Sequence, residues 1–159
     1  MKIGIDYHGV INRDPIFFAA FTKEAVKKGV EIFVVSGGAR KGVEAYLKEH
    51  DVSYNGIFSL LDYFSERNMV TFYEDGSFFV ENEIWNRAKA KFCFENGIDV
   101  HIDDSMLYGA YFQTPFCLYS PHGQNCTMIK KNISIDFSKT PDAVLEDLIE
   151  EISNLVQNK

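Results

Sequence analysis

The stretch that decides the fold is IGIDYHGVI, residues 3–11 of a chain of 159 residues. Its apolar start predicts a short buried strand, and Asp6 stands where that strand ends. In an open parallel sheet, residues just past the carboxyl ends of the strands converge on the crevice where ligands bind. Asp6 is therefore the first candidate functional residue.

Two later segments repeat this arrangement of an apolar strand followed by polar residues. Residues 30–35 (VEIFVV) form the second predicted strand, which ends at Ser36. Residues 98–102 (IDVHI) form another, which delivers Asp103 and Asp104. A single Asp at a strand end is more often a turn or capping residue. Three such ends at one edge of a sheet favour a functional site.

Helices between these strands indicate a parallel sheet with crossover connections. One runs from an Asp14-Pro15 start to Gly29, a second follows Gly38, a third spans about 83–96, and a C-terminal helix begins at Thr140-Pro141. We also expect a strand at 56–61, a hairpin of strands 69–73 and 77–80 around Asp75-Gly76, and a last short strand at 116–119. The sequence predicts one α/β domain over residues 1–159.

The composition limits the function classes. Hydrophobic residues make up 46% and charged residues 25% of the chain, as in a soluble globular protein. A net charge of −7 argues against general nucleic-acid binding, and no apolar run is long enough to span a membrane. The three cysteines are odd in number and lack C-x-x-C spacing, so they suggest neither a disulfide framework nor a zinc site. We expect a reduced, cytoplasmic location.

The residues at the strand ends suit phosphoryl chemistry. Carboxylates gathered without a neighbouring cation repel one another, and Mg²⁺, which takes oxygen ligands, relieves that repulsion where phosphate is also bound. One carboxylate can then attack phosphorus. Ser36 and the backbone N–H groups of Gly37 and Gly38 offer donors for phosphoryl oxygens. Lys89 or Lys91 could balance the remaining negative charge.

These segments resemble the motifs of the haloacid dehalogenase-like (HAD) superfamily. Residues 3–11 are similar to its first motif, residues 33–37 (FVVSG) to its second, and residues 100–104 (VHIDD) to its fourth. The third motif is a lysine at loosely defined spacing, for which Lys89 is the choice and Lys91 the alternative. The resemblance covers about two thirds of the chain and implies a Rossmann-like fold with a central parallel sheet, helices on both faces and a minimal cap or none.

The resemblance also implies roles for particular residues in a Mg²⁺-dependent phosphatase. It makes Asp6 the nucleophile and a metal ligand, and places Ser36 and Lys89 on the phosphoryl group. The remaining metal ligands would be the His8 backbone carbonyl, Asp103, and Asp104 directly or through water.

His8 departs from the family pattern, because HAD phosphatases usually carry a second Asp there as the general acid and base. A histidine can do the same work in principle, since its ordinary pKa is near ~6.5. The leading hypothesis is a phosphohydrolase that forms an aspartyl-phosphate. The alternative is a regulatory protein that binds metal and phosphate without turnover. A receiver-like domain fits poorly, because there the acid pair precedes the phosphorylated Asp.

The spacing between the motifs leaves no room for a large cap domain. The site is expected to be open unless the hairpin at 69–80 or a neighbouring subunit covers it. An open site admits a phosphorylated macromolecular end as readily as a small phosphomonoester. The sequence does not name the substrate.

Overall fold

The computed structural model describes residues 1–122 and 124–157. Its strands are β1 (Lys2–Asp6), β2 (Glu31–Ser36), β3 (Gly56–Ser59), β4 (Thr71–Phe72), β5 (Phe78–Phe79), β6 (Val100–Asp103), β7 (Phe116–Ser120), β8 (Asn125–Met128) and β9 (Ile133–Asp136). Its helices are α1 (Pro15–Lys27), α2 (Arg40–Glu49), α3 (Leu60–Ser65), α4 (Asn82–Glu95), α5 (Met106–Gly109) and α6 (Pro141–Gln157). A single wide turn, η1 (Tyr7–Ile11), follows β1.

Seven strands form one sheet in the order β3-β2-β1-β6-β7-β8-β9. The first five strands of that order are parallel. β1 lies inside the sheet because it pairs with β2 on one side and with β6 on the other, and Ile3 and Ile5 of β1 are fully buried. The expected α/β architecture with a mostly parallel central sheet is confirmed.

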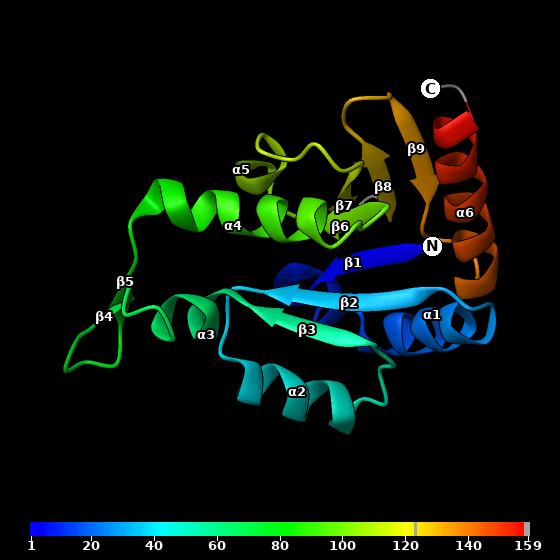
Figure 1. Cartoon of the computed structure of the whole chain (residues 1–159). Helices are drawn as coiled ribbons and strands as arrows, with labels where there is room; N and C mark the ends of the chain where they lie inside the picture. Colours follow the sequence, from blue (N-terminus) through cyan, green and yellow to red (C-terminus); the bar gives the residue numbers. More distant parts are fainter. Residues whose placement is uncertain (123, 158–159) are drawn as a thin grey trace.

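Helices cover both faces of this sheet (Figure 1). One core cluster includes Phe18 of α1, Leu47 of α2 and Leu148 of α6. The second cluster includes Phe64 of α3 and Ala88 of α4. α1 and α2 therefore share one face of the sheet with α6, and α3 and α4 share the other face.

The prediction that the sheet ends at residues 116–119 is wrong. β8 and β9 extend it by two short antiparallel strands. The strand expected at 56–61 is also shorter, because Ser59 caps α3 by accepting a hydrogen bond from the backbone N–H of Asp62. The cap converts the last two expected strand residues into helix.

β8 changes the surroundings of two cysteines. Cys117 of β7 and Cys126 of β8 are fully buried, with their Cα atoms 5.5 Å apart and their sulfurs within bonding distance. The expectation of no disulfide, which rested on the odd number of cysteines and the lack of C-x-x-C spacing, is wrong for this pair, because the antiparallel pairing of β7 and β8 brings Cys126 beside Cys117. Cys93 is buried and unpaired.

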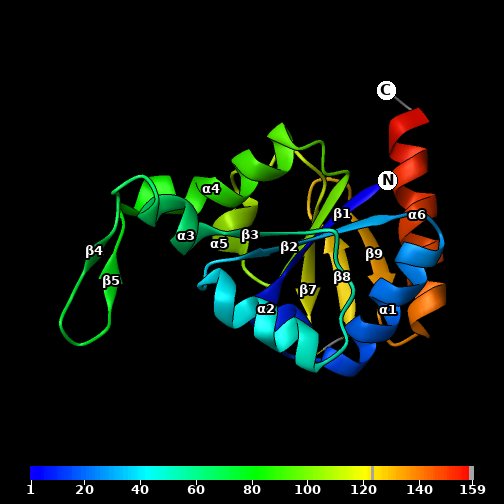
Figure 2. The same cartoon turned by 60° about the horizontal axis from the view of Figure 1, so that its bottom comes forward.

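The small sheet of β4 and β5 is a hairpin that stands away from the body in both views (Figures 1 and 2). It matches the hairpin expected around Asp75-Gly76, with shorter strands. Among the described residues, no helix combines the length and apolarity that crossing a membrane requires.

Candidate active site

Three neighbouring strands bring the candidate residues to one edge of the sheet. β2, β1 and β6 lie side by side, and they end at Ser36, Asp6 and Asp103 respectively. Parallel pairing sets all three carboxyl ends at the same edge. Residues separated by almost a hundred positions in the sequence are thus neighbours in space.

Three aspartates form an acidic cluster at this edge. Asp6, Asp103 and Asp104 each offer a carboxylate oxygen, and these oxygens lie within 4.8 Å of one another. Asp6 and Asp103 are almost fully buried, whereas Asp104 is exposed. A cluster with two members shielded from water is electrostatically costly unless a cation balances it.

Lys89 supplies part of that balance. It reaches the cluster from α4, and its Nζ lies 2.9 Å from Oδ1 of Asp6 and 2.7 Å from Oδ2 of Asp103. Its side chain is only 2% exposed, and its Nζ lies 4.3 Å from the centre of the Tyr108 ring. Lys91, the sequence alternative, is exposed and pairs with Glu95 at 3.9 Å. Of the two lysines, the structure brings Lys89 to the cluster.

The buried charges shift one another's pKa values. Burial raises the pKa of Asp6 to about 7, against the opposing effect of Lys89. Burial also acts to raise the pKa of Asp103, but hydrogen bonds and charge from His101 and Lys89 outweigh it and hold that pKa below its usual range. The pKa of Lys89 is raised, because the two carboxylates outweigh the cost of burying its ammonium. Burial and the neighbouring Asp103 raise the pKa of Asp104.

His101 supports this cluster from within the sheet. It is fully buried, its Nε2 lies 3.2 Å from Oδ2 of Asp103, and its ring stacks on Phe112 with 4.9 Å between centroids. Burial lowers the pKa of His101, so the neutral ring is favoured and Nε2–H donates to the carboxylate. The sequence analysis did not give His101 this role, although its i, i+2 spacing to Asp103 places both on one face of β6.

Gly9 has no side chain, which leaves room for the Asp104 carboxylate beside the turn after β1. Gly9 has a φ of 81°, and a Cβ there would collide with the Asp104 carboxylate. Its N–H donates to Oδ1 of Asn12 at 2.7 Å. A side chain at position 9 would be strained by the backbone and would displace Asp104.

His8 lies beside the loop that follows β2. It is exposed, and its Cε1 is 3.1 Å from the position that a Cβ on Gly38 would take. Burial and the charge of Lys89 lower the pKa of His8, against an opposing effect of Asp104. His8 therefore lies on the surface beside Gly38, close enough to Lys89 and Asp104 for their charges to act on its pKa.

The loop at residues 36–38 differs in one respect from the expectation. Ser36 is fully buried and its Oγ accepts a hydrogen bond of 3.1 Å from the N–H of Gly38, so this N–H already has a partner. α2 begins two residues later, at Arg40. Gly37 packs under Trp85, whose Cζ2 lies 3.2 Å from the position of a Cβ. The Gly38 N–H is therefore directed to Ser36 within its own loop and is not a free donor.

No protein-family model matches the chain, and no curated protein matches it significantly. The fold and the side-chain geometry therefore carry the functional argument.

Proposed function

We propose that the protein is a Mg²⁺-dependent phosphohydrolase that acts on a phosphomonoester through an aspartyl-phosphate, in the manner of HAD phosphatases. The observation that carries the proposal is the convergence of Asp6, Asp103, Asp104 and Lys89 at the carboxyl edge of the sheet. Burying such a group of charges is energetically unfavourable. The group suits a reaction in which negative charge on the substrate must be stabilised.

The donor set fits Mg²⁺. Three carboxylates face one ammonium, so the ionised cluster keeps an excess of two negative charges, which a divalent cation would neutralise. The carboxylates of Asp6, Asp103 and Asp104 would hold the ion, together with the His8 carbonyl that the family resemblance implies. The bound ion would offset the charge of the phosphoryl oxygens as they approach Asp6.

Asp6 is the proposed nucleophile. Its Oδ1 accepts hydrogen bonds from the backbone N–H of Tyr7 at 2.8 Å and from Lys89, so the carboxylate is held in one orientation. One Asp6 oxygen would form a bond to phosphorus while the ester bond breaks and the alkoxide leaves. Lys89 and Ser36 would hold the transferred phosphoryl group, and water would then hydrolyse the aspartyl-phosphate.

His8 is the proposed acid that protonates the departing alkoxide and then the base that activates water. Its position beside Gly38 supports this role, because it lies at the open side of the acidic cluster. The lowered pKa of His8 favours the neutral ring, which is the form that the base step needs, whereas the acid step needs the protonated ring. The presence of His8 where HAD phosphatases usually carry a second Asp also favours the alternative function, a metal- and phosphate-binding regulatory protein without turnover.

The deciding experiment is an assay of the purified protein against a panel of phosphomonoesters, with Mg²⁺ and with EDTA. We expect phosphate release from at least one ester in Mg²⁺ and none in EDTA. Magnesium binding by calorimetry without phosphate release would favour the regulatory alternative. If the protein neither binds Mg²⁺ nor releases phosphate, both proposed functions are contradicted.

A further inference from the structure

The hairpin of β4 and β5 carries aromatic side chains on both of its faces. Phe72 pairs with Phe78 across the strands, so these two share one face, while Phe79 pairs with Thr71 on the other. Phe72, Tyr73, Phe78 and Phe79 are 60%, 52%, 39% and 51% exposed. An isolated two-stranded hairpin is marginally stable in water. The Phe78 ring lies against Trp85 of α4, with 5.6 Å between ring centroids, whereas Phe72, Tyr73 and Phe79 are more than half exposed.

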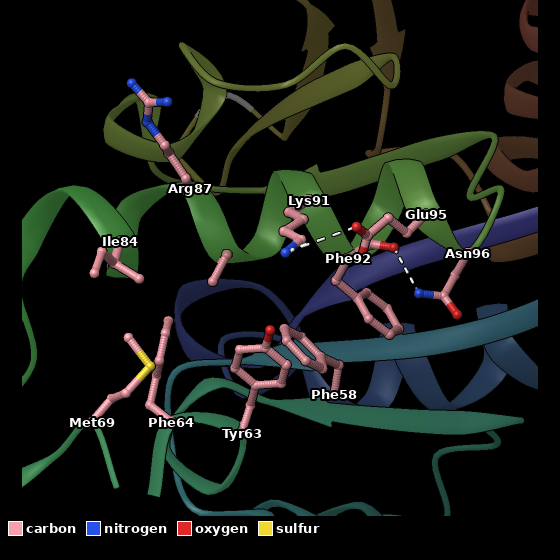
Figure 3. Close-up of a pocket in the computed structure, with 11 residues that line it drawn as sticks. Phe58, Tyr63, Phe64, Met69, Ile84, Arg87, Lys91, Phe92, Glu95 and Asn96 are labelled. Atoms are coloured by element: carbon pink, nitrogen blue, oxygen red, sulfur yellow. Dashed lines mark hydrogen bonds and ion pairs between the residues drawn. The ribbon is translucent and has the colours of Figure 1, made fainter. Parts of the chain in front are cut away.

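An apolar pocket opens close to the base of the hairpin, between α4 on one side and β3 with α3 on the other (Figure 3). Its volume is about 540 Å³, and Phe58, Tyr63, Phe64 and Phe92 line it. Met69, two residues before β4, also lines the pocket and is 40% exposed. A cavity of this size has room for aromatic side chains.

We propose that the hairpin of one chain docks into this pocket of a second copy, and that the second copy receives the reciprocal hairpin. Each chain carries both a projecting aromatic element and an apolar cavity next to its base, which is the self-complementary arrangement of a two-fold dimer. The exchange covers the aromatic faces that the single chain leaves in water.

Charge supports a second copy as the occupant. Glu74 and Asp75 lie in the turn of the hairpin, whereas Arg87 and Lys91 line the pocket. The two cations pair within α4 with Glu83 and Glu95, but these are exposed surface pairs of low energy that exchange readily. Glu95 lines the pocket as well, so the acidic tip meets a rim of two cations and one carboxylate when the hairpin enters the pocket of another chain.

The area is also adequate. Aromatic side chains bury roughly 150–250 Å² each, so the exposed parts of the four hairpin residues amount to about 400 Å² for each chain. Two hairpins would bury about 800 Å² of their own surface, and the pockets that they enter add a smaller area, so the total of about 1,000 Å² lies at the low end for a specific interface. We expect a dissociation constant in the micromolar range.

Sedimentation velocity of the full chain over a range of concentrations tests the proposal. We expect a monomer–dimer equilibrium in the parent and a dissociation constant weakened about 30-fold or more in Phe72→Asp. Glu74→Lys and Arg87→Glu should each weaken it about tenfold. The matched control is Glu150→Lys, which makes the same charge change as Glu74→Lys on an exposed site of α6, and it should leave the dimer intact.

Mixing separates the proposed contact from general damage to the chain. An equimolar mixture of Glu74→Lys and Arg87→Glu forms one parental contact and one charge-swapped contact, so the mixed dimer should recover close to the parental affinity. A parent that stays monomeric overturns the proposal. A parental dimer that Phe72→Asp leaves unchanged, or a mixture that fails to recover, also overturns it.

Discussion

The carboxyl edge of the sheet and the β4–β5 hairpin break the ordinary rules of burial in opposite ways. At the sheet edge, Asp6, Lys89 and Asp103 are charged groups buried almost completely. At the hairpin, Phe72 and Phe79 are aromatic groups left mostly in water. If stability alone decided their positions, the charged groups would be exposed and the aromatic groups buried, since buried charges and exposed aromatics are both unfavourable.

Each of the two regions lacks a binding partner of a different kind. The buried charges satisfy one another only in part, because the acidic cluster outnumbers its one lysine, and this points to a cation and an anionic ligand. The exposed aromatics have no cover within their own element, and this points to a protein surface.

The largest expected effect is on turnover in Asp6→Asn. The amide matches the carboxylate in size but is a poor nucleophile, so phosphate release should fall by about 10⁴-fold or more. Initial rates in saturating Mg²⁺ measure the effect, and Asp147→Asn on α6, which removes an exposed ion pair with Lys139, is the control. An Asp6→Asn enzyme close to the parental rate would exclude Asp6 as the nucleophile.

The second effect concerns His8. If its side chain protonates the leaving group, His8→Ala should lower turnover roughly 10²- to 10⁴-fold, while Mg²⁺ binding persists through the unchanged backbone carbonyl. His8→Asp restores the family pattern and should retain or raise the rate on poor leaving groups. The regulatory alternative expects a parent without turnover, no loss in His8→Ala, and new activity in His8→Asp.

The third effect is on stability. Lys89→Met removes the ammonium that Asp6 and Asp103 share, and breaking such a buried group should lower the free energy of unfolding by about 3–5 kcal/mol in EDTA. The corresponding fall in Tm is roughly 10 °C. Lys91→Met, on the same helix but exposed, should change stability by less than about 1 kcal/mol. Equal losses of stability in both variants would show that Lys89 stabilises the fold no more than an exposed lysine does.

The fourth effect is the pH dependence of stability at Asp6. Its folded pKa of about 7 lies above the model-compound value of 3.8, so the parent is stabilised below pH 3.8 and loses this contribution as pH rises through about 7. An asparagine does not ionise. In EDTA, the free energy of unfolding of Asp6→Asn relative to the parent should therefore rise between those pH values by about 4 kcal/mol, the equivalent of a change of about three in the pKa, which already includes the effect of Lys89. Urea unfolding at several pH values measures it, and a flat difference would contradict the raised pKa.

The strand ends could be predicted because their signal is local. Apolar runs followed by Asp6, Ser36 and Asp103 identify three strands, and the rule for parallel sheets brings their ends together. β8 and β9 could not be predicted in the same way. They are four residues each, and their side chains alternate between a buried core position and a polar edge, which leaves no continuous apolar run.

The contacts of the site depend on tertiary packing that the sequence pattern does not contain. Nothing in the spacing of α4 distinguishes Lys89 from Lys91 as strongly as their burial does in the structure. The hydrogen bond between Ser36 and Gly38 and the packing of Trp85 on Gly37 likewise appear only when the helices are placed. The contact between His101 and Asp103 could have been predicted from the sequence, because their i, i+2 spacing puts both side chains on one face of the strand.

The most direct test of the central claim is to trap the phosphoryl group on Asp6. Parent protein turning over a phosphomonoester in Mg²⁺ is quenched in acid, digested, and examined by mass spectrometry, with Asp6→Asn and an EDTA sample treated in parallel. We expect one added phosphoryl group on the peptide that contains Asp6 in the parent with Mg²⁺, and none in the other two samples. A phosphoryl group on a different residue, or steady phosphate release with no labelled peptide at any quench time, would contradict it.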